Sequence, residues 1–102
     1  MTDSAFHIGD LDDVIHGRIR LGIMAYLVGA GRASFRSIAE ALSTTDGNLS
    51  VHLRKLEEPG YIAIEKSFVG RKPLTEAVIT DVGRAAFARY LDTMSKLTDV
   101  SP

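Results

Sequence analysis

The sequence predicts one mainly α-helical domain that carries a small β-hairpin, an α+β fold. In four segments, apolar residues recur at intervals of three and four, as they do on one face of an α-helix. Between the third and fourth segments, two short apolar runs flank a stretch that contains glycine and proline, which is typical of a hairpin. The length of 102 residues, with 45% hydrophobic and 25% charged residues, suits a single globular domain over residues 1–102.

The first helix is expected at about residues 11–30. Asp10 is a suitable N-cap, and Asp13 would lie near the positive end of the helix dipole. Gly29 and Gly31 should end the helix. Both sides are apolar, so we expect one face to meet the core and the other a second subunit. One side carries Ile15, Ile19, Ile23, Tyr26, Leu27 and Ala30, and the other Leu21, Met24, Ala25 and Val28.

Two shorter helices follow. The apolar spacing of residues 35–42 predicts about two helical turns, capped by Ser34 or by Ser37. The next helix is expected at residues 45–58, with Thr45 as its N-cap and an acidic residue in its first turn. The short segment between the two helices predicts a tight turn, as in a helix-turn-helix motif.

The helix at 45–58 has one apolar and one polar side. Pro59 lacks an amide proton and disfavours a helical conformation at Glu58, so we expect an early stop, with Gly60 as the left-handed terminator. The predicted buried stripe is Leu49, His52, Leu53 and Leu56. The residues off that stripe are Asn48, Ser50, Val51, Arg54, Lys55 and Glu58.

Two antiparallel strands are expected at residues 61–65 and 74–79. The segment between them, residues 66–73, contains glycine, proline and three cations, and is expected to be a protruding turn, the wing. Phe68 is unusual in such a turn, and it either packs across the hairpin or is an exposed contact. The wing cations are Lys66 at the base and Arg71 and Lys72 at the tip.

The last helix is expected at residues 81–98, capped by Thr80 and begun by the acidic Asp81. Pairs of its apolar residues lie seven positions apart, which favours packing against another helix. Its apolar residues are Val82, Ala86, Phe87, Tyr90, Leu91, Met94 and Leu97. The full order of helix, helix, helix, strand, turn, strand and helix is that of a winged helix-turn-helix.

Four segments carry a resemblance to known proteins: residues 47–57, 60–62, 15–21 and 74–84. They are similar to the recognition helix, the strand entry, the first helix and the final strand and helix entry of winged-helix regulators of the multiple-antibiotic-resistance (MarR) and arsenical-resistance (ArsR) types. The likeness covers about residues 11–97 and implies a DNA-binding transcription regulator. The chain has no cysteine, which excludes the thiolate metal sensing of the arsenical type.

The helix at 45–58 is therefore expected in the major groove, with the wing on the DNA backbone. Asn48 could bind adenine, Arg54 could bind guanine, and Val51 could touch a thymine methyl group. A solvated helix face and a solubilising turn are the plainer interpretations of the same residues. The full expected set is Asn48, Ser50, Val51, Arg54, Lys55, Lys66, Arg71 and Lys72. Three other arginines could contact phosphates or form surface ion pairs: Arg18, Arg20 and Arg36.

The helices at 11–30 and 81–98 carry more apolar surface than a small monomer can cover, so they are expected to form a homodimer interface. A two-fold dimer would place its recognition helices about 34 Å apart and would bind a pseudo-palindromic operator in double-stranded DNA. A small-molecule effector, if there is one, would bind at this interface. With a net charge of −1, the alternative of a winged-helix protein–protein adaptor without DNA binding stays open.

Other classes of function find no support in the sequence. No serine–histidine–acid arrangement or phosphate-binding glycine loop suggests an enzyme, and no catalytic residue or cofactor is expected. His7, His16 and His52 lack the spacing of metal ligands, and His52 is expected in the core. The chain shows no signal peptide and no apolar run of the roughly 20 residues that cross a membrane, so a cytoplasmic location is expected.

Overall fold

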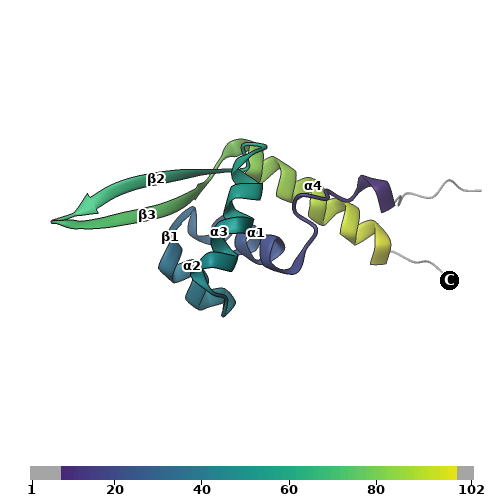
Figure 1. Ribbon diagram of the computed structural model, residues 1–102. Coiled ribbons are helices and arrows are strands. Elements are labelled where there is room, and N and C mark those ends of the chain that lie inside the picture. Colours follow the sequence, from purple (N-terminus) through teal and green to yellow (C-terminus); the bar gives the residue numbers. More distant parts are fainter. Residues whose placement is uncertain (1–7, 99–102) are drawn as a thin grey trace, which may run out of the picture.

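The computed structural model describes residues 8–98 and confirms the winged helix-turn-helix class. A three-stranded antiparallel sheet, in the order β1-β3-β2, lies beside the helices, and β2 and β3 run on beyond the body as a long hairpin (Figure 1). The elements are η1 (Ile8–Asp10), α1 (Arg18–Ala30), β1 (Arg32–Ser34), α2 (Phe35–Leu42), α3 (Asp46–Glu57), β2 (Ile62–Val69), β3 (Lys72–Ile79) and α4 (Asp81–Thr98).

The core is formed by the inner faces of the helices and by the root of the sheet. Its largest fully buried side chains are Ile15, Ile23, Met24, Leu27, Ile38, Leu49, Leu53, Leu56 and Ile62. Strand β2 pairs with β3 along its whole length, from Ile62 opposite Ile79 to Val69 opposite Lys72. The burial of β2 falls from its root to its tip, because only the root packs on the helices.

The prediction for the start of the first helix was wrong. Helix α1 begins at Arg18, not near residue 11, and the expected cap Asp10 lies in the short helix η1. The reason is a local turn held by Asp12, whose carboxylate accepts the N–H of Val14 at 2.8 Å. Gly17 then takes an extended conformation (φ 174°, ψ 145°), which separates this turn from the helix. At the other end α1 stops at Ala30, with Gly31 as its cap.

The sheet differs from the prediction in two ways. Strand β1 was not predicted; it pairs with β3 over three residues, too few to show an alternating pattern. The turn expected at residues 66–73 is shorter, because only Gly70 and Arg71 separate the strands. Gly70 has a φ of +65°, the left-handed region that a tight hairpin needs at this position. Lys66 consequently lies in mid-strand, opposite Thr75, rather than at the base of a loop.

Side-chain caps fix the starts of three helices. Ser34 caps α2, since its hydroxyl accepts the N–H of Ser37 at 3.0 Å, which decides between the two candidate serines. Thr45 caps α3 and Thr80 caps α4, both as predicted. Each cap accepts one of the N–H groups that a helix leaves unpaired in its first turn.

Helix α3 ends at Glu57, in agreement with the early stop that Pro59 predicts. Glu58 nevertheless keeps right-handed helical angles (φ −53°, ψ −48°). Gly60 follows with a φ of +84°, and its N–H donates to the Glu57 carbonyl at 2.9 Å. The N–H of Tyr61 reaches back to the Leu56 carbonyl at 3.1 Å, which completes a Schellman-type ending and directs the chain into β2.

The start of α4 is joined to the root of β2 at the Tyr61 carbonyl oxygen. This oxygen accepts the N–H of Thr80 at 3.1 Å and lies 3.0 Å from its hydroxyl. The same hydroxyl lies 2.6 Å from the Gly60 carbonyl oxygen. Gly83 approaches so closely that a Cβ atom on it would lie 2.0 Å from the Tyr61 oxygen. Helix α4 is therefore held against the root of the hairpin by backbone contacts that only glycine permits.

Candidate nucleic-acid interface

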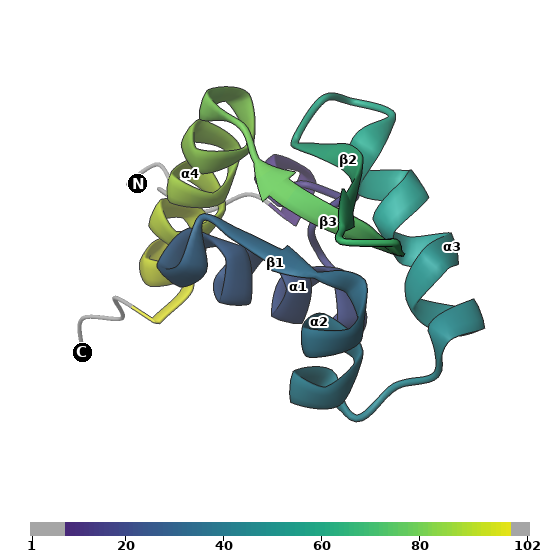
Figure 2. The same cartoon turned by 90° about the vertical axis from the view of Figure 1, so that its left-hand side faces the viewer.

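Helix α3 presents one buried and one exposed face. Leu49, Leu53 and Leu56 are buried in the core, where α3 contacts α1 and α2. The side chains on its other side are all exposed, including Val51 at 57%. We call these residues the outer face of α3: Asn48, Ser50, Val51, Arg54 and Lys55. In the view along the hairpin, α3 lies on one side of the molecule and α4 on the other (Figure 2).

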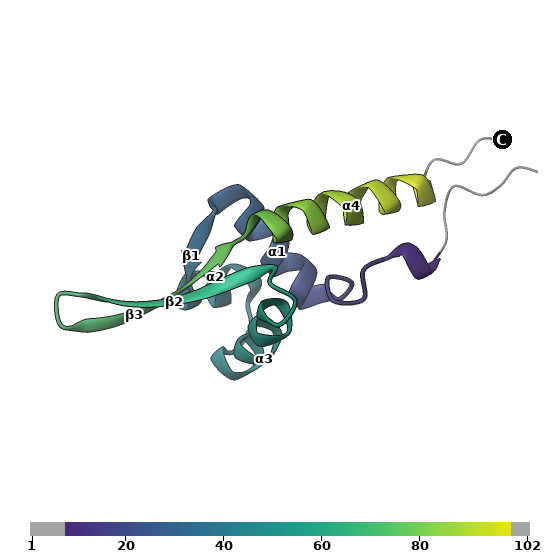
Figure 3. The same cartoon turned by 90° about the horizontal axis from the view of Figure 1, so that it is seen from above.

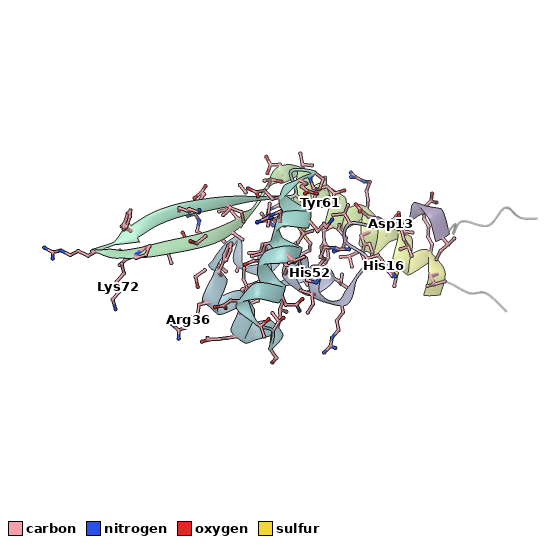
Figure 4. All side chains as sticks on the ribbon, in the orientation of Figure 1. Asp13, His16, Arg36, His52, Tyr61 and Lys72 are labelled. Carbon is pink, nitrogen blue, oxygen red and sulfur yellow. The ribbon has the colours of Figure 1, made fainter. Side chains whose placement is uncertain are left out.

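The three wing cations, Lys66, Arg71 and Lys72, are exposed as well. Lys72 projects from the hairpin near its tip (Figure 4). A groove runs between α3 and the hairpin, and Arg54 and Lys66 both line it. The structure thus brings the base of the wing beside the outer face of α3, while the tip extends away from the body (Figures 1 and 3).

Asn48 takes part in the turn between α2 and α3. Its side-chain nitrogen donates to the hydroxyl of Thr44 at 2.9 Å, while its backbone N–H donates to the cap Thr45 at 3.2 Å. A bidentate contact with adenine uses both the nitrogen and the oxygen of an asparagine amide. The amide nitrogen retains a second hydrogen for such a contact. The spacing of Thr44 and Asn48, four residues apart, was a signal for this bond that the sequence analysis missed.

Arg20 and Arg36 are engaged elsewhere. Arg20 donates to the backbone carbonyl of Val14 at 2.5 Å and lies 3.2 Å from the ring of His52. Arg36, on α2, forms an ion pair with Glu40 at 3.5 Å. Arg20 therefore stabilises the fold between the first turn and α3, so the expectation of a phosphate contact is not favoured for it.

His52 is half-buried at the edge of the core, so its expected core position was wrong. Its Nδ1 atom lies 3.2 Å from a guanidinium nitrogen of Arg20, which can only donate. Nδ1 must therefore be the unprotonated acceptor. Desolvation, together with the positive charge of Arg20, holds the pKa of His52 below its ordinary value. The recognition-helix candidate thus carries a neutral histidine on its inner side (Figure 4).

Two tyrosines attach the segment before α1 to the rest of the domain. The hydroxyl of Tyr61 donates to the carboxylate of Asp12 at 2.5 Å, and this bond is the main reason that the pKa of Tyr61 is raised. The hydroxyl of Tyr90 lies 2.8 Å from Nδ1 of His16. The segment therefore bridges the root of β2 and helix α4, which the sequence analysis did not foresee.

Within residues 8–98 no group of histidine and acidic side chains is arranged to hold a metal ion. His7 lies outside the described residues. Over the same range, no helix has both the length and the apolar character needed to cross a membrane.

Comparison with known proteins agrees with this arrangement. A model of the winged helix DNA-binding domain family matches residues 19–98. An uncharacterized protein of Methanocaldococcus jannaschii is 36% identical over 85 residues, which cover 83% of this chain and 92% of that protein.

Two solved structures are also similar. A transcriptional regulator homologue from Pyrococcus horikoshii OT3 superposes with a TM-score of 0.80 and 35% identity, over 84% of this chain and 85% of that one. A candidate transcriptional regulator of the MarR family from Enterococcus faecalis V583 has a TM-score of 0.66 and 27% identity, over 83% and 73% of the two chains.

Proposed function

This chain belongs to the winged helix DNA-binding domain family, and we propose that it regulates transcription as a homodimer whose two α3 helices bind a pseudo-palindromic operator. The observation that carries the proposal is that Ser50 and Arg54, on the outer face of α3, line the same groove as the wing cation Lys66. Similarity to transcriptional regulators favours a non-enzymatic role for this chain. In this proposal its partner is double-stranded DNA inside the cell.

The outer face of α3 supplies the base contacts in this proposal. A recognition helix inserts its first turns into the major groove, and the outer face of α3 begins in the first turn of that helix, at Asn48. Arg54 would bind guanine, Val51 would contact a thymine methyl group, and Ser50 would bind a base or a phosphate. Lys55 would contact the backbone at the edge of the groove.

The wing supplies phosphate contacts. Lys66, Arg71 and Lys72 lie in a segment, residues 66–73, that contains no acidic residue. This local excess of positive charge supports DNA binding in a chain whose net charge is −1, because the acidic residues lie elsewhere. Binding should weaken as salt rises, since each cation–phosphate contact releases condensed counterions.

Helices α1 and α4 would form the dimer interface. Three apolar residues of α4, Val82, Leu91 and Leu97, are 55%, 50% and 45% exposed and would be available to contact a second subunit. Because α4 runs from the root of the hairpin toward the end of the domain opposite the wing, pairing through its far part would leave both hairpins free (Figure 1). A small apolar effector would bind where the α1 and α4 helices of two subunits meet.

The first experiment titrates a random pool of duplexes with the protein at about 50 mM and 200 mM salt, and then selects the preferred sequences. We expect strongly salt-dependent binding and enrichment of a palindromic site. Absence of binding at the lower salt would contradict the proposal and favour the adaptor function.

A further inference from the structure

We propose that the tip of the wing is an apolar wedge, formed by Phe68 and Val69, that enters the minor groove beside the operator and kinks the duplex. The proposal rests on the proposed DNA-binding function and adds to it a cause of DNA bending. It also adds a source of sequence preference that involves no hydrogen bonds to bases.

The first observation is the exposure of these two side chains. Phe68 is 72% exposed and Val69 is 65% exposed, although both are large and apolar. Their cross-strand neighbours, Pro73 and Lys72, are exposed too, so packing across the hairpin does not cover them. Strand β1 pairs with β3 only as far as Glu76. Within residues 8–98, no third strand flanks the tip.

The second observation is the charge around them. The eight residues from Lys66 to Pro73 carry three cations and no acid. The matching partner is a polyanion with apolar surface beneath its charges, and the minor groove offers phosphates above sugars and base edges. An anionic lipid surface offers similar chemistry. DNA is favoured because the base of the wing shares a groove with the polar outer face of α3, which lipid would not complement.

The dimensions imply distortion of the DNA. The minor groove of B-DNA is about 6 Å wide. Two paired strands already lie about 4.8 Å apart between their axes, before any side chain is added. A hairpin tip that carries a phenyl ring therefore enters only a widened groove, where a base step is partly unstacked and the duplex bends. Such unstacking is easiest at pyrimidine–purine steps such as TpA.

The test uses the full chain and two duplexes that share the selected operator. One carries TpA steps in the flank under the wing and the other an A-tract, and both carry fluorophores at their ends to report bending. We expect the unaltered protein to bind the TpA duplex about tenfold more tightly and to bend it. Phe68→Ala should lose the preference and the bend, whereas Phe68→Leu should keep most of both. Thermal unfolding should be unchanged, because the ring is exposed.

Arg71→Ala is the matched control. It should weaken binding to both duplexes alike, while the preference for TpA remains. The slope of log K against log salt concentration should fall in magnitude by about 1. If Phe68→Ala binds and bends like the unaltered protein, the wedge is refuted and DNA binding stands. The wedge is equally refuted if Phe68→Ala binds and bends DNA as before and loses only self-association or binding to anionic vesicles. If the unaltered protein binds neither duplex, both the wedge and the proposed function fall.

Discussion

Replacing Gly83 by alanine tests the junction between α4 and the root of β2. The new Cβ would lie 2.0 Å from the carbonyl oxygen of Tyr61 and 2.8 Å from its carbonyl carbon. Both atoms belong to the backbone, so rotation of a side chain cannot relieve the clash. The start of α4 must move away from β2 by more than about 1 Å to restore an ordinary contact.

The expected loss of stability follows from what that movement breaks. The backbone N–H and the hydroxyl of Thr80 both bond to carbonyls in the segment that precedes β2, and each bond contributes about 1 kcal/mol. Residual overpacking adds at least about 1 kcal/mol. The better helix propensity of alanine offsets about 1 kcal/mol. The net destabilisation is about 2 kcal/mol, which lowers the Tm of a domain of this size by about 8–16 °C.

Denaturant and thermal unfolding, followed by circular dichroism, measure this change. Gly29→Ala is the matched control, because Gly29 also lies in a helix but a Cβ there would meet nothing within 4 Å. This control should be neutral or more stable by up to about 1 kcal/mol. If Gly83→Ala proves as stable as Gly29→Ala, the contact between α4 and Tyr61 does not exist as described.

Further predictions concern the proposed DNA contacts, His52 and the proposed dimer interface. Arg54→Ala should weaken operator binding by about 1–3 kcal/mol and relax one base position in a binding selection; an unchanged preference would contradict the placement of α3 in the major groove. Arg71→Ala should weaken all duplexes alike, and a loss limited to the operator would refute its phosphate role. Lowering the pH from about 7 to 5 should reduce the free energy of unfolding, because the folded state resists protonation of His52 beside Arg20 while the unfolded state accepts it. His52→Gln should flatten this part of the pH profile, and parallel profiles would exclude His52 as the cause. Leu91→Glu should shift a dimer to monomer in sedimentation equilibrium, and an unchanged mass would remove this part of α4 from the interface.

The parts of the fold that depend on local patterns were predicted from the sequence. Thr45 and Thr80 are caps whose role depends on the next three residues, and the leucine stripe of α3 repeats with the period of one helix. The start of α1 could not be predicted in the same way. There, the turn held by Asp12 is stabilised by Tyr61, which lies 49 positions away in the sequence.

The same limit applies to the candidate site. Exposure of all eight predicted contact residues follows from helix periodicity and from the position of the hairpin, both of which are local. The hydrogen bonds of Arg20 with Val14 and His52 could not be predicted in this way, because they depend on contacts between α1, α3 and the turn that precedes α1. Strand β1 escaped prediction because three residues carry no usable period, and its pairing partner lies more than forty positions further along the chain.

The cations of the wing have a consequence beyond DNA. Residues 72–75 of β3 have no β1 neighbour, so both strands of the outer hairpin have a free edge within the described part of the chain. Free edges invite pairing with another chain, and lysine, arginine and proline on such strands discourage it. The segment from Lys66 to Pro73 contains all three residue types. Replacing these cations by neutral residues, for example to test the proposed phosphate contacts, would therefore also leave an edge prone to pair with another chain. Replacing them by glutamate would keep the hairpins apart by repulsion.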